Sequence, residues 1–500
     1  MTAVSSLGIG SNLDLTTLLA NIKTGEQAPL VALQKQQTSF TARLSAYGQL
    51  SGALSALQTA ATTLSKSTLF QGVSASSSAS DVLSATAASS ATGGVYAVNV
   101  TQLSQAQSLA TGGVATTAAS IGTGSATTVI IDFGTISNAT LDPVTGKYTV
   151  ATFTPSVLLD PPVPPNLPAA TSTNSITIDS SNNTLAGIRD AINGNAGIGV
   201  TASIVNDGSA TSPNRLVLTS KQTGEASSMR ITVDGDTAVA SLLANNPADP
   251  DAQLQQTAAA QNTKLTVNGI AITSATNSVA GAIQDVTMTV TKAGASTLTV
   301  QNDTGSVQSA ITTFVTAYNS LQSVASKLTA FDAANRSGAI LLGDSVLRTV
   351  QVGIRSTLTS AQADGGSGLT MLSQIGVSFQ KDGTLVVDST KLTAALGSKL
   401  SGVASLFSGN AGVGGYGTQL GALITSYTET DGTLSSATKG INSSLDMLSK
   451  RYTAATERID ATVARYKAQF TQLDLMMSRM TATSTYLAQQ FDALNNTSKN

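Results

Sequence analysis

Residues 445–494 of this 500-residue chain read LDMLSKRYTAATERIDATVARYKAQFTQLDLMMSRMTATSTYLAQQFDAL. Apolar or small residues recur here at alternating intervals of three and four positions, with one irregularity between Ile459 and Val463. That alternation is the heptad pattern of a coiled coil, which absorbs such an irregularity as a local change in winding. Because no Pro or Gly occurs between Ile441 and Asn500, the sequence predicts one uninterrupted helix there.

The length of this helix constrains its role. At about 1.5 Å per residue, the heptad run extends roughly 75 Å, more than twice the width of a small domain. A helix of that length cannot be enclosed by a single globular core. The sequence therefore predicts that it forms a leg, or part of an assembly.

The N-terminal region carries a second amphipathic pattern. Asp14 can cap a short helix that runs to Ile22 and is interrupted at Gly25, and Pro29 is well placed to open a longer helix. The apolar face of the longer helix consists of Leu30, Leu33, Gln37, Phe40, Leu44, Tyr47, Leu50, Leu54, Leu57, Ala61 and Leu64. Amphipathic helices at both ends of a chain favour an antiparallel coiled coil with the middle of the chain inserted between them. The alternative is two separate surface helices on one globular domain.

The middle of the chain is rich in strand patterns. Residues 72–92 are almost all Ser, Ala, Thr and Gly, and we interpret them as a linker or a weakly patterned sheet edge. Strands are expected at 95–100, 128–133, 148–153, 175–178, 199–205, 215–219, 230–233, 264–267, 286–291 and 297–300, with a short helix at 184–192. Helical periodicity returns after Gly305, and the Asp382-Gly383 pair predicts a hairpin within 375–388.

These changes of pattern predict an α+β multidomain protein. Its terminal helices form coiled-coil legs around an α/β core domain that carries inserted, mostly antiparallel β domains. The expected segments are a flexible N-terminal segment (1–28), an N-terminal coiled-coil helix (29–70), a first β domain (71–125 with 255–305), a second, inserted β domain (126–254), a helical and β-hairpin core (306–440) and a C-terminal coiled-coil helix (441–500).

The composition excludes several kinds of chemistry. The chain has no Cys and no His, so it has no thiol nucleophile, histidine base, disulfide or Cys/His metal site. Its 26 basic and 28 acidic residues give a net charge of −2, which argues against a nucleic-acid partner. Polar residues interrupt every long uncharged run, so no membrane insertion is expected. We therefore expect no cofactor, no metal and no enzymatic activity.

Three local features leave alternatives open. Residues 412–417 match G-x-G-x-x-G, but without a strand–turn–helix context they predict a turn rather than a nucleotide site. Met476, Met477 and Met480 lie on or beside the heptad face, where core packing is favoured over an adaptable binding surface. Six prolines fall within 155–168, which predicts an extended, exposed loop.

Several segments together resemble one family. The segments are 7–15 at the start of the chain (with Asn12 where Gly is commoner), 96–107, 176–219, 314–321, 375–377 with 382–383, and 469–491 near the end. In this order they resemble the bacterial flagellar filament cap proteins, also called hook-associated protein 2. The resemblance fails mainly over 110–172.

The resemblance implies a structural cap at the distal tip of the bacterial flagellar filament, which retains exported flagellin and promotes its polymerisation. The implied partners are a homo-oligomeric ring of about five or six subunits, flagellin, other hook-associated proteins, and an export chaperone on the C-terminal helix. The implied location is extracellular, reached without a cleaved signal peptide. The alternatives are another hook-associated protein or flagellin of the same export system, or a surface adhesin that uses its exposed β domains and the loop at 155–168.

The residues expected to contact the filament or neighbouring subunits lie on the two leg helices. They are Leu13, Leu15, Leu33, Phe40, Leu44, Tyr47, Ile459, Tyr466, Phe470, Leu473, Met477, Met480, Tyr486, Leu487, Phe491 and Leu494.

Overall fold

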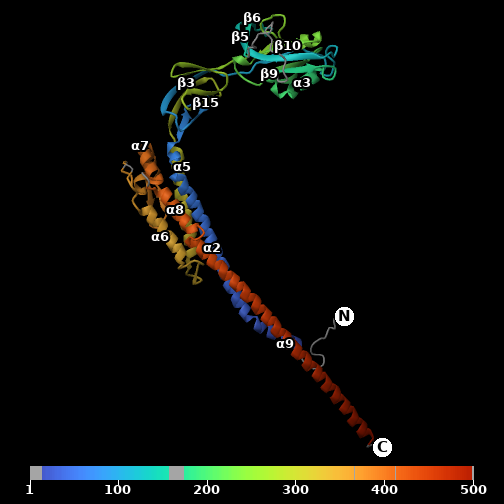
Figure 1. Cartoon of the computed structure of the whole chain (residues 1–500), viewed down its shortest axis with the longest axis vertical. Coiled ribbons are helices and arrows are strands. Elements are labelled where there is room, and N and C mark those ends of the chain that lie inside the picture. Colours follow the sequence, from blue (N-terminus) through green and yellow to red (C-terminus); the bar gives the residue numbers. More distant parts are fainter. Residues whose placement is uncertain (1–13, 157–173, 365, 367, 411–412, 498–500) are drawn as a thin grey trace. The chain divides into compact units, whose positions relative to one another are not determined.

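A computed structural model describes residues 14–156, 174–364, 366, 368–410 and 413–497, with side chains at the C-terminal end described to Ala493. The chain divides into two compact units, one formed by Met1–Phe70 with Thr304–Asn500 and the other by Gln71–Asp303 (Figure 1). The first unit is mainly helical, and the second is mainly antiparallel sheet. The predicted α+β class, with long terminal helices and inserted antiparallel sheets, is confirmed.

The helices at the two ends of the chain belong to the same unit. They are α1 (Leu15–Glu26), α2 (Ala28–Ser65) and α9 (Thr433–Thr497). Asp14 caps α1 as expected, accepting a 2.9 Å hydrogen bond from the Thr17 amide, and Pro29 lies in the first turn of α2. Two expectations need correction. Leu15–Glu26 is helical rather than flexible because Gly25 is accommodated in its last turn, and α9 begins eight residues before Ile441.

The remaining elements of the helical unit surround the upper part of α2. They are α5 (Thr304–Thr329), β17 (Phe331–Asp332), β18 (Ser337–Gly338), α6 (Ser345–Thr359), β19 (Val377–Phe379), β20 (Leu385–Val387), α7 (Ser389–Ser408) and α8 (Tyr416–Thr428). Leu50, Leu54 and Leu57 of α2 are fully buried in a core shared with α5 and α8. At the close approach of α8 to α2, a β-carbon on Gly417 would lie 2.6 Å from the Ala61 carbonyl oxygen. Only a residue without a side chain fits there.

The predicted hairpin at 375–388 is present as β19 and β20. Asn319 of α5 fixes it, because its side-chain amide exchanges two 2.8 Å hydrogen bonds with the backbone of Leu385. The Tyr318 hydroxyl donates to the Gly383 carbonyl oxygen at 3.0 Å. The hairpin is therefore anchored to the helical core by polar contacts as well as by Val377 and Leu385, which are buried.

The sheet unit contains two separate hydrophobic cores. The first lies between a five-stranded and a three-stranded sheet. In spatial order, the five strands are β1 (Val73–Ser77), β16 (Gly294–Asn302), β3 (Gly94–Gln102), β12 (Thr263–Val267) and β13 (Ile270–Ser274), and the three are β14 (Ser278–Ile283), β15 (Val286–Val290) and β2 (Leu83–Ala87). Residues 72–92 are therefore not a linker. They supply the edge strands β1 and β2, whose small Ser, Ala and Thr side chains give little sequence signal.

The second core lies between two four-stranded sheets and two helices. One sheet has the order β10 (Ser228–Asp234), β5 (Thr127–Asp142), β6 (Lys147–Pro155), with β7 (Ser175–Ile178) also on β5. The other has the order β11 (Gln255–Ala258), β4 (Ser108–Ala110), β9 (Asn214–Ser220), β8 (Val200–Asn206), and the helices are α3 (Leu185–Gly194) and α4 (Thr237–Leu243). The proline-rich loop expected at 155–168 lies outside the described residues beyond Ser156.

The boundary between the two β cores differs from the expected one at 125 and 255. Both β4 and β11 pair within the second core, and Leu109 and Leu254 are buried there. A buried amide network joins these two segments: Gln107 donates to Gln256 at 2.7 Å and accepts from the Met229 amide at 2.6 Å. Sequence periodicity could not show this boundary, because the two crossing segments are short and polar.

Candidate functional site: the distal leg surface

The first half of α9 is covered by its own chain. It runs antiparallel to α2, and the two helices lie side by side in Figure 1. The Gln34 amide of α2 donates to the Tyr452 hydroxyl of α9 at 3.2 Å. Ile459 is buried, and so is Leu15 of α1, the helix that packs against this part of α9. The predicted antiparallel pairing of the terminal helices is thus observed, and its seam ends near Phe470.

The second half of α9 continues past α2 without a helix of the described chain beside it (Figure 1). Its apolar side chains face solvent, although the heptad pattern is unbroken. We call this set the distal stripe: Leu473, Leu475, Met476, Met480, Tyr486, Leu487 and Phe491. Met480 is 61% exposed and Phe491 is 64% exposed. Large exposed apolar side chains in a row mark an interaction surface.

The structure separates the expected contact residues into two groups. The inner group is buried or half-buried within the chain: Leu15, Leu33, Phe40, Leu44, Tyr47, Ile459, Tyr466, Phe470 and Met477. The outer group is exposed: Leu473, Met480, Tyr486, Leu487 and Phe491. Leu13 and the side chain of Leu494 lie outside the described residues. Core packing was favoured for the methionine group, but Met476 and Met480 are exposed, because no second helix of the described residues covers them.

The chemistry of the distal stripe is that of a binding surface. Thioether side chains adapt to partners of different shape, and aromatic side chains contribute a large apolar contact area. Within the described ranges, no group of three or more Asp or Glu residues is placed to hold a metal ion. None of the described helices is long and apolar enough to cross a membrane.

The part of α2 that meets α6 is held there by a polar contact, and we call this part the root of the leg. Asp344 caps α6 by accepting from the Leu347 amide at 3.0 Å. Its other carboxylate oxygen accepts from the Tyr47 hydroxyl at 2.7 Å and from Arg43 at 3.3 Å. Burial, followed by this bond to Asp344, raises the pKa of Tyr47 to about 12. The hydroxyl therefore stays protonated and can keep donating at any physiological pH.

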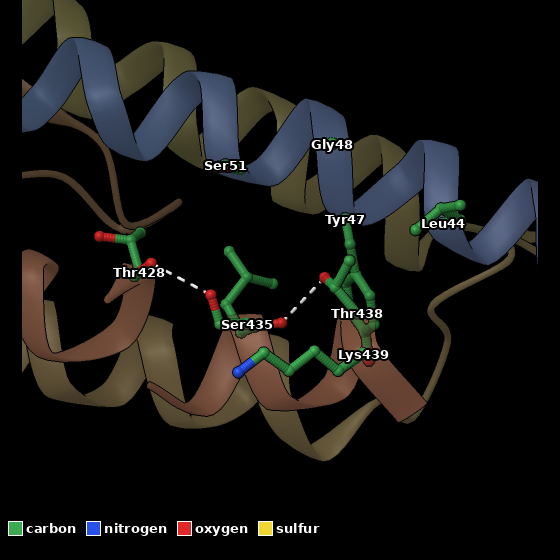
Figure 2. Close-up of a pocket in the computed structure, with 9 residues that line it drawn as sticks. Leu44, Tyr47, Gly48, Ser51, Thr428, Ser435, Thr438 and Lys439 are labelled. Carbon is green, nitrogen blue, oxygen red and sulfur yellow. Dashed lines mark hydrogen bonds between the residues drawn. The ribbon is translucent and has the colours of Figure 1, made fainter. Parts of the chain in front are cut away.

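A pocket of about 460 Å³ lies beside this contact, between α2, the end of α8 and the start of α9 (Figure 2). Leu44, Tyr47 and Leu434 supply its apolar surface. Gly48 also lines the pocket, and a β-carbon there would meet nothing within 4 Å. Lys439 lies along one side, where its amine donates to the Thr430 carbonyl oxygen at 2.7 Å.

Sequence reasoning missed both features at the root of the leg. Asp344 precedes a helical pattern and so carries a capping signal, but its contact with Tyr47 joins residues far apart in the chain. Gly48 carries a weaker signal, as a glycine inside a helical pattern. The exposure of the distal stripe had no sequence signal, because its heptads resemble those of the covered half.

These observations define a class of protein before they define a family. The chain is a protein with a long helical leg that ends in an exposed apolar surface, and two β cores are inserted in its sequence between α2 and α5. Two family models match it: Flagellar hook-associated protein 2 N-terminus over residues 11–107, and Flagellar hook-associated protein 2 C-terminus over residues 260–482.

Full-length relatives agree with these matches. Flagellar hook-associated protein 2 of Escherichia coli K12 is 39% identical over 99% of this chain and 100% of its own length. That of Salmonella typhimurium LT2 is 38% identical over the same shares. The crystal structure of the flagellar cap protein FliD D1-D2-D3 domains from Escherichia coli is 36% identical, with a TM-score of 0.57 over 79% of this chain and 99% of that chain.

The chain belongs to the flagellar hook-associated protein 2 (FliD) family, and its function is that of a flagellar cap. The family resemblance of the sequence is confirmed. The two family models leave residues 108–259 between them. This gap coincides with the second β core, from β4 to β11, so the family models do not describe that core.

Proposed function

We propose that this chain assembles as a homo-oligomer on the distal end of the flagellar filament, outside the cell, where it retains exported flagellin and promotes its polymerisation. Its role is structural rather than enzymatic. The distal stripe of α9 is the surface by which each leg contacts the filament or a neighbouring subunit. The observation that carries the proposal is the change along α9 from buried heptads to exposed heptads.

The size of the stripe suits a contact that must form and break. Fully burying one large apolar side chain contributes about 1.5–3 kcal/mol, and these side chains are already partly covered by their own helix. The burial of several such side chains therefore contributes a free energy only slightly larger than the cost of association, which is about 4–15 kcal/mol. A single leg therefore binds weakly. A ring of about five or six legs, the number that the family resemblance implies, holds firmly through multivalency.

The same surface needs protection before assembly. An exposed row of Met, Leu and Phe side chains promotes aggregation in the cytoplasm. We propose that an export chaperone covers the distal stripe until the chain is exported. Other hook-associated proteins are proposed as further contacts, at the filament end on which the cap first forms.

Truncation after Gln472 tests the proposal, because it removes the distal stripe and leaves the covered half of α9 intact. The truncated chain should keep its helical and sheet cores, measured by circular dichroism and thermal unfolding. It should fail to decorate filament ends in electron micrographs, and cells should secrete unpolymerised flagellin. Replacing the exposed polar residues Gln489 and Gln490 by Ala serves as the matched control and should leave capping intact. Normal filament growth with the truncated chain would show that the stripe is not the contact surface.

A further inference from the structure

A row of arginines runs along α9 at exact heptad intervals. Arg451, Arg458, Arg465 and Arg479 are separated by seven or fourteen residues, and Gln472 occupies the one intermediate position. Seven residues of an α-helix make nearly two turns, so these side chains share one face at steps of about 10.5 Å. We call this set the arginine row.

The arginine row lies between two other rows of the same period. Each arginine directly precedes a bulky residue, namely Tyr452, Ile459, Tyr466 and Met480, and Leu473 and Leu487 continue this row of bulky residues at the same spacing. On its other side is a row of small residues, Ala454, Ala461, Ala468 and Ala482, which Leu475 of the distal stripe interrupts. Alanines at heptad spacing let a second helix approach closely. The face therefore combines close approach with positive charge, and arginine is a residue enriched at protein interfaces.

The chain itself does not neutralise the arginine row. All four side chains are exposed, and among the described residues none of the four lies in an ion pair. No Asp or Glu occurs three or four residues before or after any of them, so the usual intrahelical ion pairs cannot form. Lys450 provides the contrast, since Asp446 lies four residues before it. The described partner of the row is the Tyr466 ring, 5.7 Å from the Arg465 guanidinium carbon.

We propose that the arginine row binds an α-helix of another protein that presents Asp or Glu at matching seven-residue intervals. The inference rests on the proposed role of α9 as the contacting leg, and it names the chemistry of the partner. A planar guanidinium pairs with a carboxylate in a bidentate manner, so the row sets the register and direction of the bound helix. The distal stripe then supplies apolar contact at the end of the leg, beyond Tyr466.

A second copy of the chain does not fit this face. The residues that come directly after each bulky residue form a further row, which includes Asp460 and Asp474, but Lys467 lies between these two. The leg of a second copy therefore presents Lys467 where the arginine row would need a third acidic residue, and like charges at close range disfavour association. The partner is therefore a helix with an unbroken acidic row, supplied by a protein other than this one.

Two synthetic helical peptides provide the probe. Both carry the same Leu and Ala frame over four heptads, with Glu at each seventh position in one and Lys in the other. Binding to the full-length chain is measured by fluorescence anisotropy in 50 mM and 300 mM NaCl. The Glu peptide should bind at least about tenfold more tightly than the Lys peptide, and this preference should fall at the higher salt concentration.

A matched pair of variants tests the position of the charges. Arg458→Glu with Arg465→Glu should weaken Glu-peptide binding by about a hundredfold, roughly tenfold for each arginine. The control variant, Lys450→Glu with Lys467→Glu, changes the net charge by the same amount at positions outside the arginine row. It should weaken binding of the Glu peptide less than about threefold. Equal losses in the two variants would show that net charge alone attracts the peptide, and equal binding of the two peptides would overturn the proposal. The outcome is independent of capping, because truncation after Gln472 retains Arg451, Arg458 and Arg465.

Discussion

The contact between Asp344 and Tyr47 gives a quantitative test of how the leg is fixed to the helical body. Tyr47→Phe removes one hydroxyl that donates to a carboxylate at 2.7 Å. A hydrogen bond to a charged group contributes about 1.5–3 kcal/mol. The Asp344 side chain is 4% exposed, so solvent cannot replace the lost donor fully. We expect Tyr47→Phe to reduce the free energy of unfolding by about 2 kcal/mol.

Asp344→Ala should cost more, because it also removes the cap of α6. The loss of the cap adds about 1 kcal/mol. The 3.3 Å ion pair with Arg43 adds little, since that side chain is 40% exposed and solvent screens the interaction. The expected total is roughly 3 kcal/mol, which corresponds to a fall in melting temperature of about 6–12 °C for a unit of this size.

Urea unfolding followed at 222 nm measures both changes, because most of the helix is in this unit. The double variant gives the coupling between the two residues. We expect the effects of Tyr47→Phe and Asp344→Ala to be non-additive by at least 1 kcal/mol, since both remove the same hydrogen bond. Additive effects would refute the reasoning, because they would mean that the two side chains do not stabilise the fold through their contact.

Three further predictions concern single positions. Gly48→Ala should raise the stability of the helical unit by about 0.5–1 kcal/mol, because alanine favours the helix and its β-carbon meets open space. Gly417→Ala should lower this stability by more than 2 kcal/mol, because the backbone of α2 occupies the space that its β-carbon would need. Thermal unfolding measures both changes. Hydrogen bonding to Arg215 lowers the pKa of Asp207 to about 2. The stability that Asp207 contributes is therefore present above its ordinary pKa of 3.8 and is lost as the pH falls through about 2. An NMR titration should show the lowered pKa, and Arg215→Ala should raise this pKa. Gln107→Leu should destabilise the second β core by about 2–4 kcal/mol, because it leaves the Met229 amide without its acceptor, and hydrogen exchange at Met229 should increase.

Much of the fold could be predicted from periodicity. The long helix at the C-terminus, the helix opened by Pro29 and the hairpin around Asp382-Gly383 were all expected and are present. Strands at 128–133 and 215–219 were expected and are present within β5 and β9, because runs of Val, Ile, Leu and Thr favour strands. The edge strands β1 and β2 were not distinguished from a linker, because strands made of Ser, Ala and Thr differ little from a loop in sequence. The boundary between the β cores was missed, because it depends on which strands pair rather than on local pattern.

The sequence by itself determined that α9 is a long amphipathic helix without Cys or His chemistry, because heptads and composition are properties of the chain. It also determined the arginine row, since helix geometry places every seventh residue on one face. Only the tertiary structure decided which half of α9 is available to a partner. Ile459 and Met480 both lie on the heptad face, yet Ile459 is buried and Met480 is exposed. The physical reason is that α1 and α2 cover only the first half of α9, and helices encoded more than 400 residues apart set where that cover ends.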